Sequence, residues 1–498
     1  MLSPRKITAI AMILRNNKYF DRIPYWQIDN LSLKCNYMTK RKRTVLFFTC
    51  LISFLVIAPL IVLYSQGYRL DPRNRTITKT GAFYIKASPK NCDVFIDGKL
   101  VSKTDFLFGT DLIENLIPGT YLMEIGKQGY IPWQKNLKIK AMMTTEAKNI
   151  VLFPQNLALQ NNTSNVNRIF PIPSNKKLIL EKKDSQGWYL TSFDLKNSLE
   201  EILFLEKDFD KKGLGSNLED LIWSDDSKKA IAKISINETE KFFLINIENK
   251  ISPISLDPLG NFEKISFQAN DSSKFLISKM STLYSGDFAS LKTIKLIDNI
   301  IDFTIADNKL YFLDGNGFVT RIDDLESFSG QKLSDTPFTI MPENFYELKA
   351  EHRHLFLKQK DLLFWFNQQE NAFVKIANNA TDLTVSQDNG KLAYLNNTEI
   401  SVYFFKEKIE QIEEREPDQN MLLGRFSEKI GQVFWLNNDY LLFTVGNKLK
   451  VAEIDNRDQA NIIDLAEINN PQIYFNKDNK KASVLSQGNL LTSNPILP

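Results

Sequence analysis

The longest unbroken run of apolar residues lies near the start of the chain and predicts a transmembrane helix. Residues 44–65, TVLFFTCLISFLVIAPLIVLYS, contain no charged side chain. At about 1.5 Å per residue, a helix of this length crosses the roughly 30 Å hydrocarbon core of a bilayer. The run is too long for the apolar region of a cleavable signal peptide, and membrane helices tolerate a residue such as Pro59. A buried core helix is the alternative, and the absence of charge disfavours it.

Charge on the two sides of this run predicts its orientation. Residues 1–43 hold ten Lys and Arg residues and two Asp, a net charge of +8, whereas the whole chain carries +3 and the remainder therefore −5. The cations Lys40 to Arg43 directly precede the apolar run, so the positive-inside rule places residues 1–43 in the cytoplasm and the rest outside. Residues 1–37 are either an amphipathic helix on the inner membrane face or a stretch upstream of the true start at Met38. Residues 66–80 form a short juxtamembrane linker.

Short alternating segments follow from residue 81 to about residue 150. Phe83 and Ile85 alternate with polar neighbours, and the same period of two recurs at Val94 and Ile96, at Tyr121, Met123 and Ile125, and at Leu137 and Ile139. Asp97-Gly98 is a strong two-residue hairpin signal, and Pro118-Gly119 suits a type II turn. The pattern predicts a small antiparallel β-sandwich over residues 81–150.

This segment resembles the PEGA family, small β-domains of prokaryotic envelope proteins. The name-giving tetrapeptide reads Pro89-Lys90-Asn91-Cys92 here, and the family's Thr-Pro appears as Thr104-Asp105, which are two departures. The resemblance implies an envelope role and carries no catalytic residues. The matching residues are Gly81, Ser88-Pro89, Val94-Phe95-Ile96-Asp97-Gly98, Leu116-Ile117-Pro118-Gly119-Thr120-Tyr121, Gly129-Tyr130 and Trp133.

A longer repeat occupies residues 160–498. Each copy is an apolar strand, a polar turn rich in Ser, Asp, Asn and Lys, and a second apolar strand. The copies are spaced by about 43 residues on average, which is the period of a four-stranded propeller blade. We expect a β-propeller of eight blades, or of seven if one copy belongs to an inserted strand pair. The first residues after the eight turns are Leu178, Ala230, Phe275, Leu310, Leu355, Leu392, Leu441 and Ala482.

These copies resemble degenerate blades of TolB-type and WD-repeat-like propellers. Their turn commonly reads Trp-Ser-Pro-Asp-Gly-Lys, and the second copy, Trp223-Ser224-Asp225-Asp226-Ser227-Lys228, comes nearest. A charged segment, Ile409 to Asn420, interrupts the array before the seventh turn and predicts an exposed loop or short helix. The fold class is therefore mainly β, with one N-terminal transmembrane helix, a PEGA-like sandwich and a propeller.

Composition limits the chemistry that this chain can perform. Charged residues make up 24% and hydrophobic residues 43%, which excludes general disorder and a polytopic membrane protein. The acidic remainder after the apolar run excludes nucleic-acid binding. Three cysteines, at positions 35, 50 and 92, leave one outside the membrane, so no disulfide is expected within the exterior domains.

Candidate catalytic and metal-binding motifs are few. His352 and His354 share a face if they lie in a strand, but they occupy a blade turn, and we interpret them as exposed turn residues rather than metal ligands. Asp314 to Gly317 begins like a calcium loop and fits a hairpin turn better. Acidic pairs such as Asp323-Asp324 and Glu413-Glu414 are interpreted as solvated charges. We therefore assign no catalytic, cofactor-binding or metal-binding residue.

Two functions of different classes remain. We favour a non-enzymatic binding or scaffolding protein, anchored in the cytoplasmic membrane and exposed outside it. Its propeller would bind an envelope protein or glycan, and residues 44–65 would contact the lipid bilayer. The alternative is an extracytoplasmic hydrolase or lyase with a carboxylate-based site, since propellers host such enzymes.

Overall fold

The computed structural model describes residues 39–72, 75–325, 327, 329–405, 408–409, 414–415, 419–455 and 457–498. The predictions for residues 1–37 and for a start at Met38 lie outside the described residues. Helix α2 (Lys40–Ser65) has Pro59 in its interior and is exposed along almost its whole length. Within the described part of the chain it is the one helix long and apolar enough to cross a membrane, and a signal sequence has the same character. Strands β1 (Tyr68–Asp71) and β2 (Thr76–Lys79) follow as a two-stranded sheet.

The next seven strands form two sheets that enclose one core. The prediction of a purely antiparallel sandwich is wrong at one ladder, because β3 and β9 pair in parallel, with Phe83 opposite Thr145. One sheet, in the order β6-β3-β9, consists of β3 (Gly81–Ser88), β6 (Thr110–Leu116) and β9 (Thr144–Val151). The other, in the order β5-β4-β7-β8, consists of β4 (Asp93–Ile96), β5 (Lys99–Lys103), β7 (Gly119–Gly126) and β8 (Trp133–Ile139).

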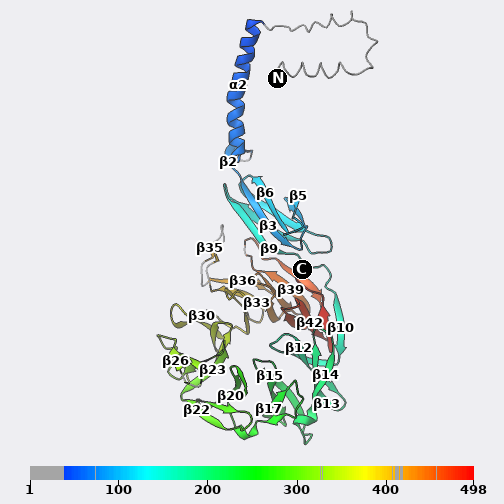
Figure 1. The fold of residues 1–498 in the computed structure, drawn as a ribbon, viewed down its shortest axis with the longest axis vertical. Helices are drawn as coiled ribbons and strands as arrows, with labels where there is room; N and C mark the ends of the chain where they lie inside the picture. The colour runs from blue at the N-terminus through cyan, green and yellow to red at the C-terminus, as the bar shows by residue number, and fades with distance from the viewer. Residues whose placement is uncertain are drawn as a thin grey trace, which may run out of the picture. The chain divides into compact units, whose positions relative to one another are not determined.

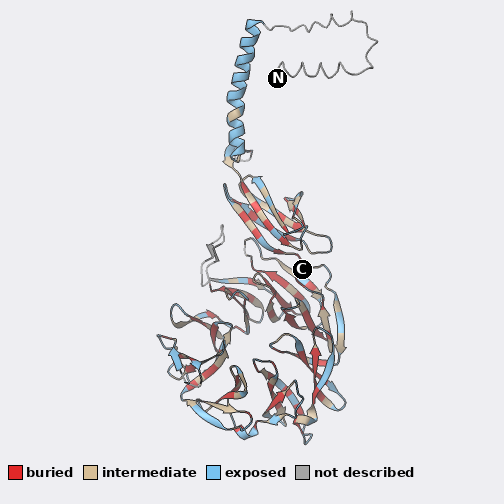
Figure 2. Ribbon diagram, viewed as in Figure 1, coloured by how far each residue is buried: buried red, intermediate tan, exposed pale blue. Residues whose placement is uncertain are grey.

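The period-two pattern predicted which side chains face this core. Phe83, Ile85, Val94, Met123 and Ile125 are all fully buried. Figure 2 shows the same alternation of buried and exposed positions along the strands of the sandwich.

The two predicted turns of the sandwich have different outcomes. Asp97 and Gly98, with φ of 50° and 75°, join Ile96 directly to Lys99, as the hairpin signal indicated. The prediction of a type II turn at Pro118-Gly119 is wrong. Gly119 does not have the positive φ that this turn requires and instead begins β7. The Pro-Gly pair carries the chain from one sheet to the other.

Cys92 lies inside the sandwich core. Its side chain is 0% exposed, and its thiol donates a hydrogen bond of 2.8 Å to the carbonyl oxygen of Pro89. Burial raises the pKa of the Cys92 thiol. Cys92 and the helix residue Cys50 are both free thiols.

Residues 159–493 form eight four-stranded sheets, together with the two-stranded pair β34 and β35 (Figure 1). We number the sheets by the order of their first complete hairpin. The first contains β11 (Val166–Pro171), β12 (Lys177–Asp184), β13 (Gly187–Asp194) and β14 (Glu200–Leu205), and helix α3 (Glu206–Phe209) follows it. The second contains β15 (Ser216–Trp223), β16 (Lys229–Ile236), β17 (Thr239–Asn246) and β18 (Ile254–Ser255), followed by the 3-10 helix η3 (Asp257–Leu259). The third contains β19 (Lys264–Gln268), β20 (Asp271–Lys279), β21 (Thr282–Asp287) and β22 (Thr293–Ile297). The fourth contains β23 (Ile300–Ala306), β24 (Lys309–Asp314), β25 (Val319–Asp324) and β26 (Ser329–Lys332).

The remaining four sheets repeat this arrangement. The fifth contains β27 (Tyr346–Glu351), β28 (His354–Gln359), β29 (Leu362–Asn367) and β30 (Ala372–Ala377). The sixth contains β31 (Asp382–Val385), β32 (Lys391–Leu395), β33 (Glu399–Phe404) and β36 (Gln419–Arg425). The seventh contains β37 (Ile430–Trp435), β38 (Tyr440–Val445), β39 (Lys448–Glu453) and β40 (Ile462–Glu467). The eighth contains β41 (Gln472–Asn476), β42 (Lys481–Ser486), β43 (Asn489–Ser493) and the much earlier β10 (Leu159–Ser164).

Each of the eight residues that follow the repeated turns lies in the second strand of a different sheet. All eight are at most 5% exposed, from Leu178 in the first sheet to Ala482 in the eighth. The turn is therefore the point where the chain reverses between the first and second strands of each sheet. Because one buried residue follows the polar turn in each sheet, this pattern recurs once per sheet along the sequence.

The eighth sheet closes the array into a ring. Its outer strand is β10, which precedes the first sheet, and Leu159 pairs with Ser493 across this ladder. The amide of Val166, at the start of β11, also donates to the carbonyl oxygen of Gly488 at 3.0 Å. Eight sheets in sequence order, closed by pairing of the first and last strands, are the architecture of a β-propeller.

Polar groups hydrogen-bond across every boundary between consecutive sheets of the ring. These contacts complement the apolar packing because each one satisfies a donor or acceptor close to buried strands. In order from the first boundary they are Ser174 N to Ser227 Oγ (3.1 Å), Lys229 Nζ to Ser272 O (3.1 Å), Lys264 Nζ to Asp302 Oδ1 (2.9 Å), Leu348 N to Asp302 Oδ2 (2.7 Å), Val385 N to Glu351 Oε1 (2.8 Å), Trp435 Nε1 to Thr384 O (2.9 Å), Ile473 N to Gln432 Oε1 (2.8 Å) and Tyr474 OH to Asn175 Oδ1 (2.6 Å).

The charged insertion within the sixth sheet is partly described. Strands β34 (Lys408–Ile409) and β35 (Glu414–Arg415) pair antiparallel in this segment. The prediction of a loop or short helix is therefore wrong for these residues, which form a two-stranded ladder. The residues between the two strands lie outside the described part of the chain.

A buried charge cluster ties the sandwich to the seventh sheet. Lys135 of β8 is 1% exposed, and its ammonium lies 3.1 Å from Glu453 Oε2 and 2.7 Å from the carbonyl oxygen of Asp455. Glu453 also accepts hydrogen bonds from the Trp133 indole, at 3.1 Å, and from the Asn461 amide, at 2.9 Å. Burial raises the pKa of Glu453, and the Lys135 charge opposes that shift. The sandwich is thus fixed to the ring by polar contacts as well as by apolar ones.

We predict that Lys135→Met lowers the free energy of unfolding by about 3–5 kcal/mol, because it leaves the buried Glu453 carboxylate without its cation. Chemical denaturation monitored by circular dichroism measures this change. The matched control is Lys138→Met on an exposed position of the same strand, which should change stability little. Adding Glu453→Gln to Lys135→Met should recover most of the loss, since an amide oxygen still accepts from Trp133. A loss as large in the double variant would contradict the charge argument.

We predict that Tyr474, at the boundary that closes the ring, makes stability fall in alkaline solution. Burial first, and then the Asp478 charge, raises the pKa of Tyr474 from 10.0 to about 12. The unfolded chain therefore loses this proton at lower pH than the folded chain, so the contribution is complete below pH 10 and is lost as pH rises toward 12.

Tyr474→Phe tests this expectation. It should cost about 1 kcal/mol at pH 8, where only the hydrogen bond to Asn175 is lost. Between pH 10 and 12 its stability should fall less steeply than that of the unmodified protein. Tyr284→Phe, in the third sheet, is the control for general alkaline effects. Identical pH profiles for all three proteins would refute a role for Tyr474.

Candidate functional site

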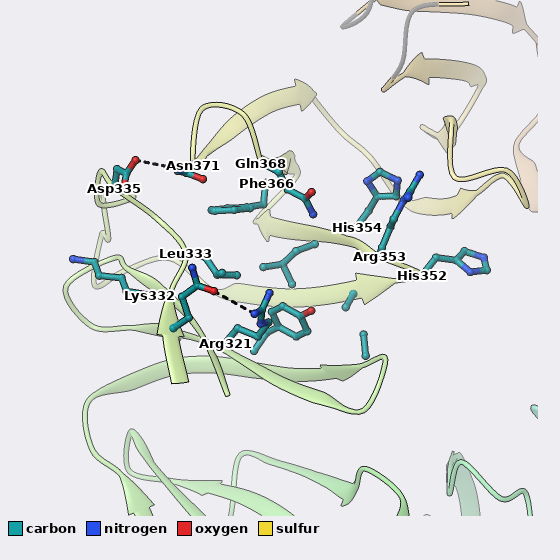
Figure 3. A pocket seen from close by; sticks show the side chains of 15 residues that line it. Arg321, Lys332, Leu333, Asp335, His352, Arg353, His354, Phe366, Gln368 and Asn371 are labelled. Atoms are coloured by element: carbon teal, nitrogen blue, oxygen red, sulfur yellow. Dashed lines mark hydrogen bonds between the residues drawn. The ribbon is translucent and has the colours of Figure 1, made fainter. Parts of the chain in front are cut away.

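A polar groove of about 350 Å³ lies between the fourth and fifth sheets of the ring (Figure 3). Strands of both sheets, together with the turns and the connection between them, supply its lining. Tyr311 comes from β24, Arg321 from β25, and Gln331 and Lys332 from β26. The turn between β27 and β28 contributes His352 and Arg353, and Phe366 and Gln368 come from the end of β29 and the residues just after it.

The connection from β26 to β27, residues 333–345, forms one side of the groove. Ser334 Oγ accepts a hydrogen bond of 2.9 Å from the amide of Val319, and Asp335 accepts one of 2.9 Å from the Asn371 side chain. Phe338 packs edge-on against the rings of Phe364 and Phe373. These contacts attach the connection to both sheets, so the groove is held by ordered secondary structure on each side.

Cations dominate the charge of the groove. Arg321 is shared between Asp323, at 2.9 Å, and the side-chain oxygen of Gln331, at 3.2 Å. The Lys332 ammonium lies over the Phe318 ring at 3.1 Å from its centroid. Among the described residues, Lys332 has no ion-pair partner, and Arg353 has neither an ion pair nor a side-chain hydrogen bond. The one lining carboxylate, Asp335, is already hydrogen-bonded to Asn371.

The two histidines lie at the edge of this groove in different environments. His352 is exposed in the turn, with φ of 51°, as expected. The expectation is wrong for His354, which begins β28 and is 8% exposed. Its ring stacks on Phe405 with centroids 4.0 Å apart. Figure 3 shows the His352 ring pointing away from the His354 ring.

Hydrogen bonds assign the tautomer of His354. The Trp365 indole N–H can only donate, and it lies 3.1 Å from His354 Nδ1, so that nitrogen accepts. The proton is therefore on Nε2, which donates to the carbonyl oxygen of Asn389 at 3.0 Å. Both ring nitrogens have partners, and the second one crosses from the fifth sheet to the sixth. His354 is thus a structural residue of the ring.

The other singled-out acidic residues do not meet in one site. Asp314 and Gly317 form the turn between β24 and β25, as predicted, and Asp314 Oδ1 accepts from the amides of Asn316 and Phe318 at 3.0 and 2.8 Å. Asp323 pairs with Arg321 and with Lys309. Glu413 lies outside the described residues. Within the described residues, no three His, Cys, Asp or Glu side chains are grouped to hold a metal ion.

The two histidines were singled out from the sequence, but the cations of the groove were not. Arg321, Lys332 and Arg353 lie on three separate elements, and each looks like an ordinary surface cation in its own strand or turn. The signal that could have indicated them is the long connection 333–345, since extended loops on a rigid scaffold often carry function.

The chain was compared with known proteins by sequence and by structure. No protein-family model matches the chain, and no curated protein sequence matches it. Among solved structures, the Dos1 propeller is 14% identical, with a TM-score of 0.44 over 68% of this chain and 95% of that one. The propeller domain of Myceliophteria thermophila Cps50 (Swd1) is 11% identical, with a TM-score of 0.40 over 68% of this chain and 99% of that one.

An enzyme is also among these structures. An oligogalacturonate lyase in complex with manganese is 12% identical, with a TM-score of 0.36 over 68% of this chain and 99% of that chain. The class of β-propeller rests on the eight sheets and their closure.

We predict that His354→Phe lowers the free energy of unfolding by about 1–3 kcal/mol. Phenylalanine keeps the stacking on Phe405 but leaves the buried Trp365 N–H without an acceptor. The control His352→Asn, two residues away in the exposed turn, should stay within about 0.5 kcal/mol, since Asn also tolerates a positive φ. Urea denaturation of the three proteins measures the difference, and equal stabilities would show that the tautomer assignment carries no energetic weight.

Proposed function

We propose that the protein is a membrane-anchored scaffold of the prokaryotic cell envelope, with helix α2 spanning the cytoplasmic membrane and the β-domains outside. The four cations Lys40 to Arg43 at the start of α2 support an N-inside orientation. The β-domains follow α2 and belong to the part of the chain that carries a net charge of −5. In this proposal the sandwich is a PEGA-like module, which its Asp97-Gly98 hairpin and its two-sheet core support.

The closed ring is the observation that carries the binding function. We propose that its eight sheets are eight blades of one propeller, a rigid body that presents loops on broad faces. The sandwich contacts this ring through the buried Lys135–Glu453 pair. A rigid platform near a membrane suits the capture of an envelope protein or glycan without chemical change of that partner.

Topology and binding can be tested together in the producing cell. External protease on intact cells or spheroplasts should digest the β-domains and leave a small anchored fragment. Full protection of the chain would overturn the orientation. Chemical cross-linking on intact cells, followed by purification of the full-length protein in detergent, should enrich one envelope protein or glycan above a control membrane protein. Turnover of a substrate that is lost when ring carboxylates are replaced by Ala would favour the enzyme class instead.

A further inference from the structure

We propose that the groove between the fourth and fifth sheets binds an acidic glycan, a sugar chain that carries carboxylate or phosphate groups. This inference rests on the proposed binding function of the ring and names the ligand class of one site. It begins from the charge of the lining. Arg321, Lys332 and Arg353 are permanent or nearly permanent cations, whereas Asp335 is the one carboxylate of the lining.

The lining of the groove also offers more charged hydrogen-bond donors than free charged acceptors. Arginine and lysine side chains donate and cannot accept. Acceptor oxygens close to these cations are already in use, because Asp323 and Gln331 Oε1 accept from Arg321 and Asp335 accepts from Asn371. The remaining charged donors belong to Lys332 and Arg353, which have no carboxylate partner among the described residues. A ligand that fits must therefore bring negatively charged acceptors.

The arrangement of the two unpaired cations favours a ligand with more than one charge. Figure 3 shows Lys332 on one side of the groove and Arg353 on the other, with Arg321 between them. A single small anion reaches one of these positions, whereas an oligomer with an acidic group on successive units reaches both. The cavity volume of about 350 Å³ holds a short section of such a chain.

The surface between the cations favours sugar over peptide. Phe366 and Leu355 are buried beneath the groove, at 5% exposure each, so they offer little apolar area to a partner. Protein partners ordinarily anchor through an apolar centre with buried aromatic or aliphatic side chains. The exposed groups here are the Gln368 amide, the Gln331 amide and the His352 imidazole, which suit hydroxyl groups.

Binding measurements on the full-length protein in zwitterionic nanodiscs test the proposal. The probes are a hexameric uronate oligosaccharide, a sugar phosphate oligomer, inorganic phosphate, a neutral glucose hexamer and poly-L-glutamate of equal charge, each followed by calorimetry. We expect binding of one or both acidic oligosaccharides, weakening as salt rises because the contacts are charge-assisted. We expect no binding of the neutral hexamer and much weaker binding of free phosphate.

The variant Lys332→Gln/Arg353→Gln should weaken acidic oligosaccharide binding about tenfold or more, since each cation contributes a charge-assisted hydrogen bond. Both side chains are exposed, and only the contact of Lys332 with the Phe318 ring is lost, so the unfolding curve should shift little. The matched control Lys196→Gln/Lys477→Gln removes the same charge from the first and eighth sheets and should bind like the unmodified protein.

Three results would overturn the proposal. They are an absence of binding by both acidic oligosaccharides, an equal loss in the control variant, and tighter binding of poly-L-glutamate, which would assign the groove to an acidic peptide. The envelope partner found by cross-linking is an independent result, so the scaffold function survives if this groove fails. Protection of the chain from external protease would contradict the proposed orientation but would not alter the binding measured by calorimetry.

Discussion

Closure of the ring is the constraint on which the rest of the exterior structure depends. Each four-stranded sheet has two apolar faces, and it buries both only when a neighbour packs on either side. A linear array of such sheets would leave one face of its first and last members in water. The pairing of β10 with β43 removes both ends at once, at the cost of joining segments more than 300 residues apart. The sheet boundaries then carry the polar contacts that hold neighbouring sheets in register.

The sandwich obtains part of its order from this closed ring. Its strand β8 alternates strictly, yet one of its inward positions is Lys135, whose ammonium is satisfied by Glu453 and Asp455 of the seventh sheet. A lysine at that position would be unfavourable in an isolated sandwich, because burial of an unpaired charge is costly. The residue therefore joins the two domains, which belong to one compact unit.

Local patterns predicted most of the fold, and contacts between distant segments account for what they missed. Alternation at Phe83 and Ile85, the Asp97-Gly98 turn and the buried residue after each polar turn are all encoded within a few positions. The parallel pairing of β3 with β9 joins residues about 60 positions apart and leaves no local signal. His354 looked like part of an exposed turn because its partners, Trp365, Asn389 and Phe405, come from other segments of the chain. The groove was missed for the same reason, since its cations converge only in three dimensions.

Cys92 gives this protein a built-in reporter of local opening. The chain has no other cysteine after residue 50, and the Cys92 thiol is sealed in the sandwich core with a raised pKa. Thiol reagents react with the exposed thiolate, so alkylation of Cys92 has to wait until the core opens. When the core opens and closes much faster than the reagent reacts, the ratio of two rates reports on opening. The labelling rate of Cys92 divided by the labelling rate of a free thiol then equals the equilibrium constant for opening, as in amide hydrogen exchange. One natural side chain thus separates the opening of the sandwich from the unfolding of the cysteine-free ring, without any engineered label.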